Sequence, residues 1–286
     1  MSRSWQLESG RISDIVRSKK HYEDLVEFHW RYYSELAFQR KKIRQELNDS
    51  LRDAARPFEF SKWQRIVKYK YALDPLSARG SLSDPGGRFN VGAIDITRYP
   101  MFASLYLASD KGTALAEVLG REKAVGTLTP EELALTRPDS ITAVSVSGKL
   151  ESVLDVSVAD NLAGFVTLIK KFKLPFPLIS EARRLGQPPL RLITTVTDLQ
   201  TVLMLEHWRD WPMLYDVPAG GQVFGGIALD AGIEGVLYES VSTRRKCLAV
   251  FPQNFLNSSS FIELDDAVPR EDVPSRIDSS NFARFT

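Results

Sequence analysis

The stretch Gly86-Gly87-Arg88-Phe89-Asn90-Val91-Gly92 carries the strongest local signal in this chain of 286 residues. Adjacent glycines allow the backbone to approach a ligand closely, and an arginine presents a rigid fork of donors. The surrounding segment, residues 73–92, is dense in Pro, Gly, Ser and Asp, which predicts a loop. Because binding residues collect in loops, we expect this one to belong to a functional site.

The segments that flank this loop predict the elements that hold it. Residues 58–71 are rich in aromatic and β-branched side chains and are predicted to be extended. Residues 104–108 predict a short buried strand, and residues 111–119 predict a helix with Ala114 and Leu115 on its apolar face. These elements bring together the residue types of a possible site, Arg65, Arg88, Tyr106 and Glu117.

This set of side chains suits a phosphorylated sugar. Arginine binds phosphate through charged hydrogen bonds, and a tyrosine ring can stack on a base or sugar. A carboxylate can hold a ribose hydroxyl and stabilise positive charge at the anomeric carbon. Ordinary structural roles are the alternatives, namely a surface ion pair for Arg65, a loop cap for Arg88, core packing for Tyr106 and a solvated helix position for Glu117.

These residues, together with two further motifs, make the chain resemble the RES domain family, which is named for its Arg, Glu and Ser. The resemblance runs from Trp63 to Pro252. It comprises an arginine after the first aromatic residue, the glycine loop, a Tyr-Leu-Ala strand and an Ala-x-x-Glu helix. It ends with Gly-Val-Leu-Tyr-Glu-Ser at 235–240 and a strand closing in Val-Phe-Pro at 250–252.

The resemblance implies a fold similar to ADP-ribosyltransferases and membership of a toxin–antitoxin pair. Characterised RES proteins degrade NAD with water or phosphate, or transfer ADP-ribose. Position by position, the resemblance implies that the catalytic residues are Arg65, Tyr106 and Glu117, and that the substrate-binding residues are Arg88, Asn90 and Ser240. One departure concerns the family serine, which stands three residues before a glutamine. Counting back from Gln222 gives Ala219.

Three regions are expected along the chain. Residues 1–57 form an N-terminal helical extension, since residues 11–55 contain no Gly or Pro and repeat apolar residues at helical spacing. Residues 58–264 form the RES-like domain, and residues 265–286 form a polar, loosely held tail. Helices and strands are mixed without regular βαβ alternation, which favours an α+β fold. Further strands are expected at 141–146, 153–156, 235–238 and 248–251, a closely packed helix at 220–232, and a surface excursion with at most one short helix at 173–191.

Composition excludes several classes. The net charge of +1 gives no overall field for nucleic acid or membrane lipid. The only cysteine, Cys247, excludes a disulfide framework and cysteine-rich metal sites, and favours a cytoplasmic protein. Neither GxGxxG nor GxxxxGK[ST] occurs, and no histidine has metal-ligand spacing, so we expect no metal and no resident cofactor.

The sequence therefore predicts an NAD-consuming toxin that cleaves the nicotinamide–ribose bond, as an NAD glycohydrolase or phosphorylase. NAD would be a consumed substrate. A protein ADP-ribosyltransferase is the first alternative, and a catalytically weakened binding module is the second, since position 219 is alanine. The expected partners are NAD and an antitoxin protein, with a homo-oligomer possible and with no nucleic acid or membrane.

Overall fold

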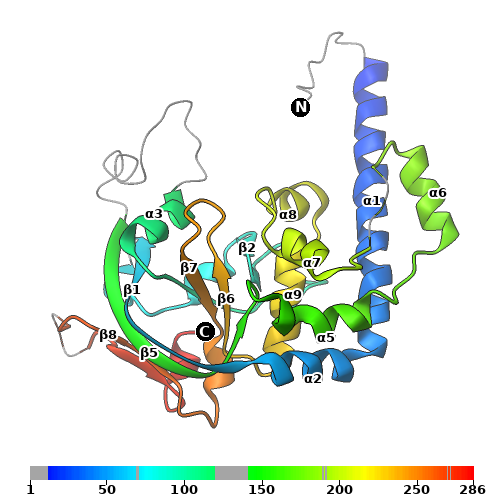
Figure 1. Ribbon diagram of the computed structural model, residues 1–286. Coiled ribbons are helices and arrows are strands. Elements are labelled where there is room, and N and C mark those ends of the chain that lie inside the picture. Colours follow the sequence, from blue (N-terminus) through cyan, green and yellow to red (C-terminus); the bar gives the residue numbers. More distant parts are fainter. Residues whose placement is uncertain are drawn as a thin grey trace.

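The structure is a computed structural model that describes residues 12–68, 71–119, 141–188, 190, 192–268, 270 and 272–286 (Figure 1). It confirms the predicted α+β class. The helices are α1 (Ile12–Lys42), α2 (Arg44–Ala54), α3 (Lys111–Leu119), α5 (Ala159–Ile169), α6 (Phe176–Arg184), α7 (Val196–Leu203), α8 (Asp210–Tyr215) and α9 (Gly220–Asp230). The strands are β1 (Arg56–Lys68), β2 (Gly86–Gly87), β3 (Asn90–Val91), β4 (Leu105–Ala108), β5 (Ile141–Asp155), β6 (Gly235–Glu239), β7 (Lys246–Val250), β8 (Phe261–Leu264) and β9 (Arg276–Asp278).

The main sheet has the strand order β1-β4-β7-β6-β5-β8-β9. Strand β1 also pairs with β5, from Arg56 opposite Val153 to Lys68 opposite Ile141, so the first five strands form a closed ring. Only β5 and β6 run parallel within this ring. The small hairpin β2–β3 lies within the glycine loop. Closure leaves few free strand edges and fixes β4, β6 and β7 as the central strands.

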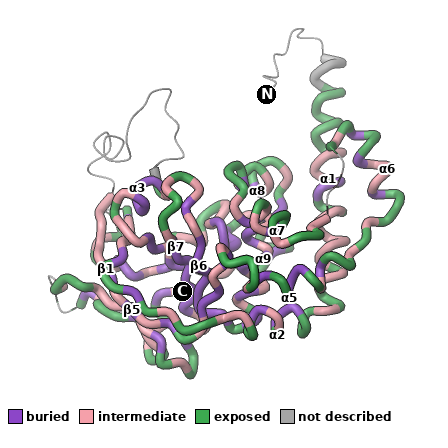
Figure 2. Tube along the Cα trace, in the orientation of Figure 1, coloured by how far each residue is buried: buried purple, intermediate pink, exposed green. Residues whose placement is uncertain are grey.

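Two apolar clusters lie on opposite sides of this sheet. One packs the sheet against α2, α5, α7 and α9, and includes Phe165, Phe224 and Val236. The other fills the interior of the ring and includes Leu105 and Leu248. The tube in Figure 2 is buried along β6 and β7, where apolar residues face both clusters. Strands buried on both faces form a rigid support for the segments at their ends.

Helix α9 packs unusually close to the glycine loop. A Cβ atom added at Gly221 would overlap the carbonyl oxygen of Arg88, and one added at Gly225 would overlap that of Phe89. The helix can therefore approach the loop only because these positions lack side chains. This confirms the expected helix at 220–232 and gives the reason for its glycines.

The N-terminal segment forms two helices. Helix α2 buries Leu47 and Leu51 against α5 and α9, so it belongs to the main core. Helix α1 stands at the side of the molecule and packs against α6 and α8 (Figure 1). Within the described ranges, none of the helices has both the length and the apolar character that a bilayer crossing requires.

One expectation is confirmed in a longer form and one is wrong. The strands predicted at 141–146 and 153–156 belong to a single strand, β5, which continues through Gly148, where the backbone of Phe261 approaches closely. The C-terminal segment after Asp265 is not a loosely held tail. Strand β9 pairs with β8, and Ile277 and Phe285 are fully buried in the ring interior. The burial of these isolated apolar residues stabilises the packing of the otherwise polar C-terminal segment against the core. The single helix α6 agrees with the excursion predicted at 173–191.

Candidate active site

The glycine loop is organised around the side chain of Asn90, which is fully buried. Its Oδ1 accepts hydrogen bonds from the Gly87 backbone N–H and the Tyr106 hydroxyl, both at 2.9 Å. Its Nδ2 group donates to the carbonyls of Ser81 and Phe102 at 2.8 and 3.0 Å. These four bonds use the full capacity of an amide side chain. Asn90 therefore shapes the loop, and its role as a substrate contact stays a prediction.

Tyr106 joins the loop to the centre of the sheet. It lies on β4, opposite Ala249 of β7. Its hydroxyl accepts a hydrogen bond from the Phe89 backbone N–H at 2.9 Å while donating to Asn90. A Cβ atom at Gly87 would overlap the phenol, so the loop crosses directly over the ring. Gly87 is thus required for the contact between the loop and the tyrosine.

Glu117 extends from the last turns of α3 and is half-buried. Its Oε1 accepts a hydrogen bond of 2.7 Å from the hydroxyl of Ser240, which is fully buried where β6 leaves the sheet. The same hydroxyl oxygen accepts from the backbone N–H groups of Ser242 and Thr243, at 3.3 and 3.4 Å. Ser240 therefore fixes both the β6–β7 turn and the orientation of the carboxylate.

Arg88 brings a positive charge into the protein interior. It is 5% exposed, and its Nη1 donates to the carbonyl of Leu203 at 3.2 Å and to that of Leu205 at 2.8 Å. Its charge reaches the buried Tyr238, whose pKa is raised by burial and by the nearby Glu117 carboxylate and is lowered slightly by Arg88. The charges of Glu117 and Arg88 thus act on the pKa of the same buried phenol in opposite directions.

The same two charges act on the pKa of the Cys247 thiol, on the adjacent strand β7. Burial raises the pKa of its thiol, Glu117 raises it further, and Arg88 lowers it. The thiol is buried and stays protonated, so it is not a nucleophile at neutral pH. Contacts link these elements to one another: Ser240 bonds Glu117, Tyr106 bonds the backbone of Phe89, and the Phe89 ring packs, at 5.1 Å between ring centroids, against Tyr238, a residue that the sequence analysis did not select as part of the site.

Arg65 lies at the edge of this group and fastens a loop. Its Nε donates to the carbonyl of Pro75 at 2.8 Å, and its Nη2 to that of Ser77 at 2.7 Å. A longer bond of 3.4 Å joins Nη1 to the carbonyl of Tyr106. Burial lowers the pKa of the guanidinium to about 10, and the Asp74 charge opposes that change. The group remains charged at neutral pH and connects β1, β4 and the loop before the glycines.

Ala219 occupies the N-cap of α9 and is 1% exposed. The side chain of Gln222 accepts a hydrogen bond from its backbone N–H at 2.9 Å, and donates to the carbonyls of Pro85 and Asn90. Gln222 thereby ties the start of α9 to the glycine loop, a function that the sequence analysis missed. Its only sequence signal was a glutamine three residues after a possible N-cap.

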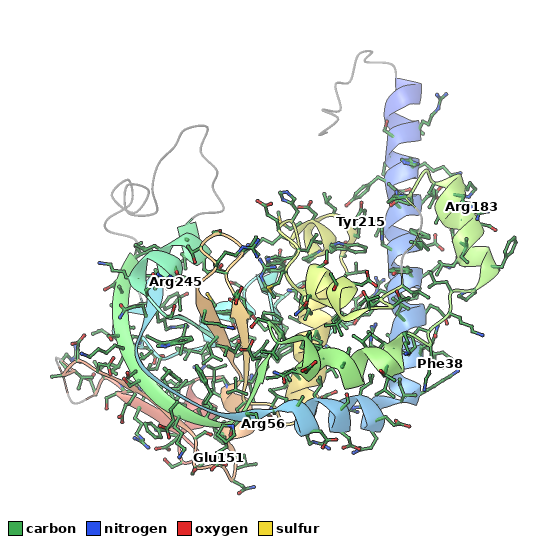
Figure 3. All side chains as sticks on the ribbon, in the orientation of Figure 1. Phe38, Arg56, Glu151, Arg183, Tyr215 and Arg245 are labelled. Atoms are coloured by element: carbon green, nitrogen blue, oxygen red, sulfur yellow. The ribbon has the colours of Figure 1, made fainter. Side chains whose placement is uncertain are left out.

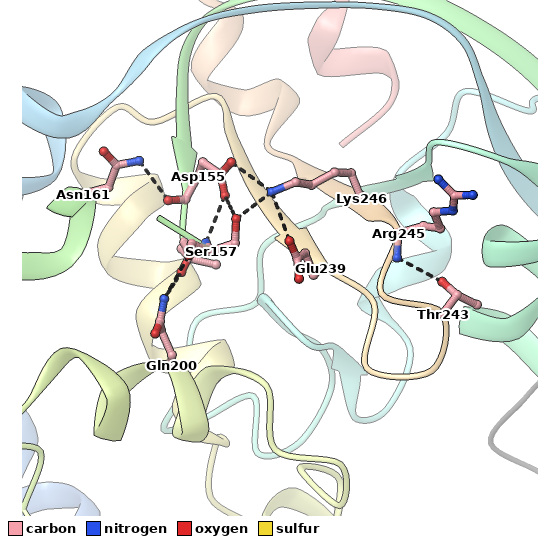
Figure 4. A network of polar contacts seen from close by, with 9 residues as sticks. Asp155, Ser157, Asn161, Gln200, Glu239, Thr243, Arg245 and Lys246 are labelled. Carbon is pink, nitrogen blue, oxygen red and sulfur yellow. Dashed lines mark hydrogen bonds and ion pairs between the residues drawn. The ribbon is translucent and has the colours of Figure 1, made fainter. Parts of the chain in front are cut away.

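A second polar network lies at the ends of β5, β6 and β7 (Figure 4). The Lys246 ammonium contacts the Asp155 carboxylate at 3.2 Å, the Ser157 hydroxyl at 2.6 Å and the Glu239 carboxylate at 3.6 Å. Figure 3 shows Arg245 beside it on the β6–β7 hairpin, close to α3. Among the described residues, no cluster of three or more His, Cys, Asp or Glu could hold a metal ion.

The site contains a fixed carboxylate, a buried cation and a tyrosine beneath a glycine loop. Such a set can bind an anionic group with Arg88 and stabilise developing positive charge with Glu117. The side chains come from β4, α3, the β6–β7 turn and the glycine loop, and the strands between them are rigidly packed. The geometry is therefore preorganised for a substrate that carries both kinds of charge.

A solved structure described as the crystal structure of the M. tuberculosis MbcT–MbcA toxin–antitoxin complex is 16% identical, with a TM-score of 0.43. The match covers 84% of this chain and 96% of that chain. No curated protein sequence matches. The family model for the RES domain matches residues 62–268. The chain therefore belongs to the RES domain family.

Proposed function

We propose that this protein cleaves the bond between nicotinamide and ribose in NAD, as the toxin of a toxin–antitoxin pair. Membership of the RES family supports the reaction class. The observation that carries the proposal is the fixed carboxylate of Glu117, held by the Ser240 hydroxyl at 2.7 Å. Cleavage of the bond to the pyridinium nitrogen needs no acid, because nicotinamide leaves as a neutral molecule. An anion beside the ribose carbon stabilises the positive charge that develops there.

In the proposed reaction the C1″–N bond breaks, and both electrons leave with nicotinamide. The ribose acquires oxocarbenium character, which the negative charge of Glu117 stabilises. Water or phosphate then donates an electron pair to C1″ and loses a proton to solvent. The products are nicotinamide and either ADP-ribose or its 1″-phosphate.

The other residues have distinct proposed roles. Arg88 contributes its buried charge to the pyrophosphate, and Tyr106 packs against the nicotinamide or its ribose while it supports the loop. Arg65 remains proposed as a pyrophosphate contact, and its three bonds to backbone carbonyls also hold the site together. Ser240 acts through Glu117 as a positioning residue.

The test is NAD turnover by the purified chain, with products separated by chromatography in the presence and absence of phosphate. Glu117→Gln keeps the shape of the side chain and removes its charge, so we expect a loss of about 10²–10³-fold in rate. Glu263→Gln is the matched control, since Glu263 is an exposed residue of β8 paired with Arg276. We expect it to retain full activity.

The outcomes separate the alternatives. Nicotinamide release that depends on Glu117 supports the proposal, and the second product identifies the acceptor. Nicotinamide release only when a protein acceptor is added would indicate an ADP-ribosyltransferase. The absence of turnover with any acceptor would overturn the enzymatic proposal and favour a binding module. Expression in the cytoplasm of a bacterial host gives a second readout, because the toxin should stop the growth of the host unless its antitoxin is present.

A further inference from the structure

A cavity of about 270 Å³ lies between α1 and the helices α5, α7, α8 and α9. Its walls are apolar, and many of the side chains that line it are aromatic. Helix α1 closes one side of it, standing beside α7 and α8 in Figure 1. The rings that line it are Tyr32, Tyr33, Phe165, Phe172, Trp208, Trp211 and Phe224.

This cavity does not belong to the RES domain alone. The side chains of α1 that line it, among them Tyr33, Leu36 and Arg40, precede residue 62, where the family match begins. The opposite wall includes Val223 and Ile227 of α9, within the family match. Docking of the N-terminal extension therefore creates a space that the family domain would leave open on one side.

Arg40 is the one charged side chain among the described residues that line this cavity. No carboxylate in the described part of the chain forms a salt bridge with it, and its guanidinium lies 5.6 Å from the centre of the Tyr33 ring. Burial lowers its pKa, while Tyr33 and Tyr32 raise it. A cation in an apolar wall is costly unless an anion accompanies it.

We propose that this cavity binds a small monoanion with a flat apolar body, such as an aromatic carboxylate. One guanidinium matches one carboxylate and can engage it through two parallel hydrogen bonds. The aromatic lining matches a ring system, which gains from stacking and from leaving water. The volume admits a small ligand and excludes a whole dinucleotide.

The cavity shares a wall with the active site. Leu205 lines the cavity with its side chain, while its carbonyl accepts a hydrogen bond from Arg88. Ala219 and Gly220 also line it, and the next residue, Gly221, packs on the carbonyl of Arg88. A bound ligand would therefore contact the residues that hold Arg88, although its binding does not depend on the proposed NAD chemistry.

The test uses 2-naphthoate and its neutral analogue 2-naphthamide as probes, with binding measured by isothermal titration calorimetry on the full chain. We expect 2-naphthoate to bind about tenfold or more tightly than the amide, because a charged hydrogen bond is formed. Arg40→Met should reduce naphthoate affinity to that of the amide. Lys41→Met, at the adjacent exposed position of α1, should leave both affinities unchanged.

Two further variants locate the probe and guard against misfolding. Val223→Phe keeps Arg40 and fills the cavity, so it should abolish binding of both probes. Glu117→Gln, at the other site, should bind 2-naphthoate as the native chain does. The proposal is overturned if the native chain binds no naphthoate, if both probes bind equally, or if Arg40→Met keeps the preference for the anion. Binding that Val223→Phe leaves intact would also overturn it.

Discussion

The hydroxyl of Ser240 donates a hydrogen bond of 2.7 Å to the carboxylate of Glu117, although 123 positions separate the two residues in the chain. The bond joins α3 to the turn between β6 and β7. A carboxylate with one fixed oxygen keeps a single orientation, and an electrostatic contribution to catalysis depends on that orientation. We therefore propose that the serine acts through Glu117 as a positioning residue.

Replacing Ser240 by alanine should reduce kcat for NAD cleavage by about 10- to 100-fold, the equivalent of one hydrogen bond to a charged group. KM should change little, because the lost interaction acts in the transition state. The double variant Ser240→Ala/Glu117→Gln should be no slower than Glu117→Gln alone. Steady-state kinetics of the three proteins checks this.

Ser242→Ala is the control for the turn. Ser242 is exposed, and its backbone N–H, which contacts Ser240, remains in the variant. It should retain native kinetics. If the effects of Ser240→Ala and Glu117→Gln simply multiply, Ser240 does not act through Glu117, and a direct contact with substrate becomes the better explanation.

Two neighbouring glycines of α9 should respond in opposite ways to alanine. At Gly225 the added Cβ overlaps the Phe89 carbonyl, so Gly225→Ala should lower the free energy of unfolding by about 1–3 kcal/mol or more. At Gly226 the nearest atom is 3.7 Å away, on Phe102. Gly226→Ala should therefore be stabilising by about 0.5–1 kcal/mol, the difference in helix propensity. Urea denaturation measures both.

This pair also tests the link between α9 and the glycine loop. If Gly225→Ala displaces the loop, it should weaken NAD turnover along with stability, whereas Gly226→Ala should leave turnover unchanged. Equal stability changes for the two variants would show that the helix can shift away from Phe89 without cost, and that close packing does not hold the loop in place.

Much of the fold could be predicted where the signal is local. The glycine loop, the strand at Tyr106 and the helix that carries Glu117 follow from short patterns of glycine, β-branched and alanine-rich sequence. The C-terminal segment could not be predicted, because β9 is stabilised by its pairing with β8 and by the burial of Ile277 and Phe285. Such contacts between distant segments leave no periodic pattern.

The candidate site shows the same difference between local sequence patterns and contacts between distant segments. Residue types indicated Arg88, Tyr106 and Glu117, whose joint role at a site stays a prediction. The sequence did not show that Asn90 turns inward, because an asparagine beside glycines can bind either a ligand or its own loop. Gln222 and Tyr238 were missed for a related reason. Their polar atoms act on segments that are distant in the chain, and these contacts appear only in the folded protein.

Restoring serine at position 219 should stabilise the protein. Ala219 has extended backbone angles at the N-cap of α9, and Gln222 already supplies the return bond of a capping box. A serine hydroxyl could accept from the backbone N–H of Gln222, which is worth about 1 kcal/mol. For a chain of this size we expect Tm to rise by about 2 °C. Differential scanning calorimetry measures the change.

Ala219→Cys controls for the added volume, since a thiol is a poor acceptor at nearly the same size. It should not raise Tm. If the serine and cysteine variants shift Tm equally, the hydrogen bond is not the cause. Activity gives an independent readout: an increase in NAD turnover by Ala219→Ser beyond its effect on stability would indicate that the restored hydroxyl also contacts the substrate.

The docking of α1 should depend on pH through His29. This residue is 5% exposed, and its ring stacks on Tyr215 at 3.8 Å and meets the edge of Trp211 at 5.0 Å. Figure 3 shows Tyr215 on α8 facing α1. Burial lowers the pKa of His29 from 6.5 to about 4, and the polar side chain of Gln187 opposes this change. The folded protein therefore keeps the imidazole neutral.

Because the pKa is lower in the folded state than in the unfolded state, this contribution to stability is complete above pH 6.5. It is lost as the pH falls from 6.5 to about 4. The full difference corresponds to roughly 3 kcal/mol. The free energy of unfolding of the native chain and of His29→Phe can be measured by urea denaturation at several pH values. As the pH falls from 6.5 to about 4, the variant should gain stability relative to the native chain. His21→Gln, an exposed position on the same helix, should behave like the native chain. Parallel curves for the native chain and His29→Phe would show that His29 does not control the docking of α1.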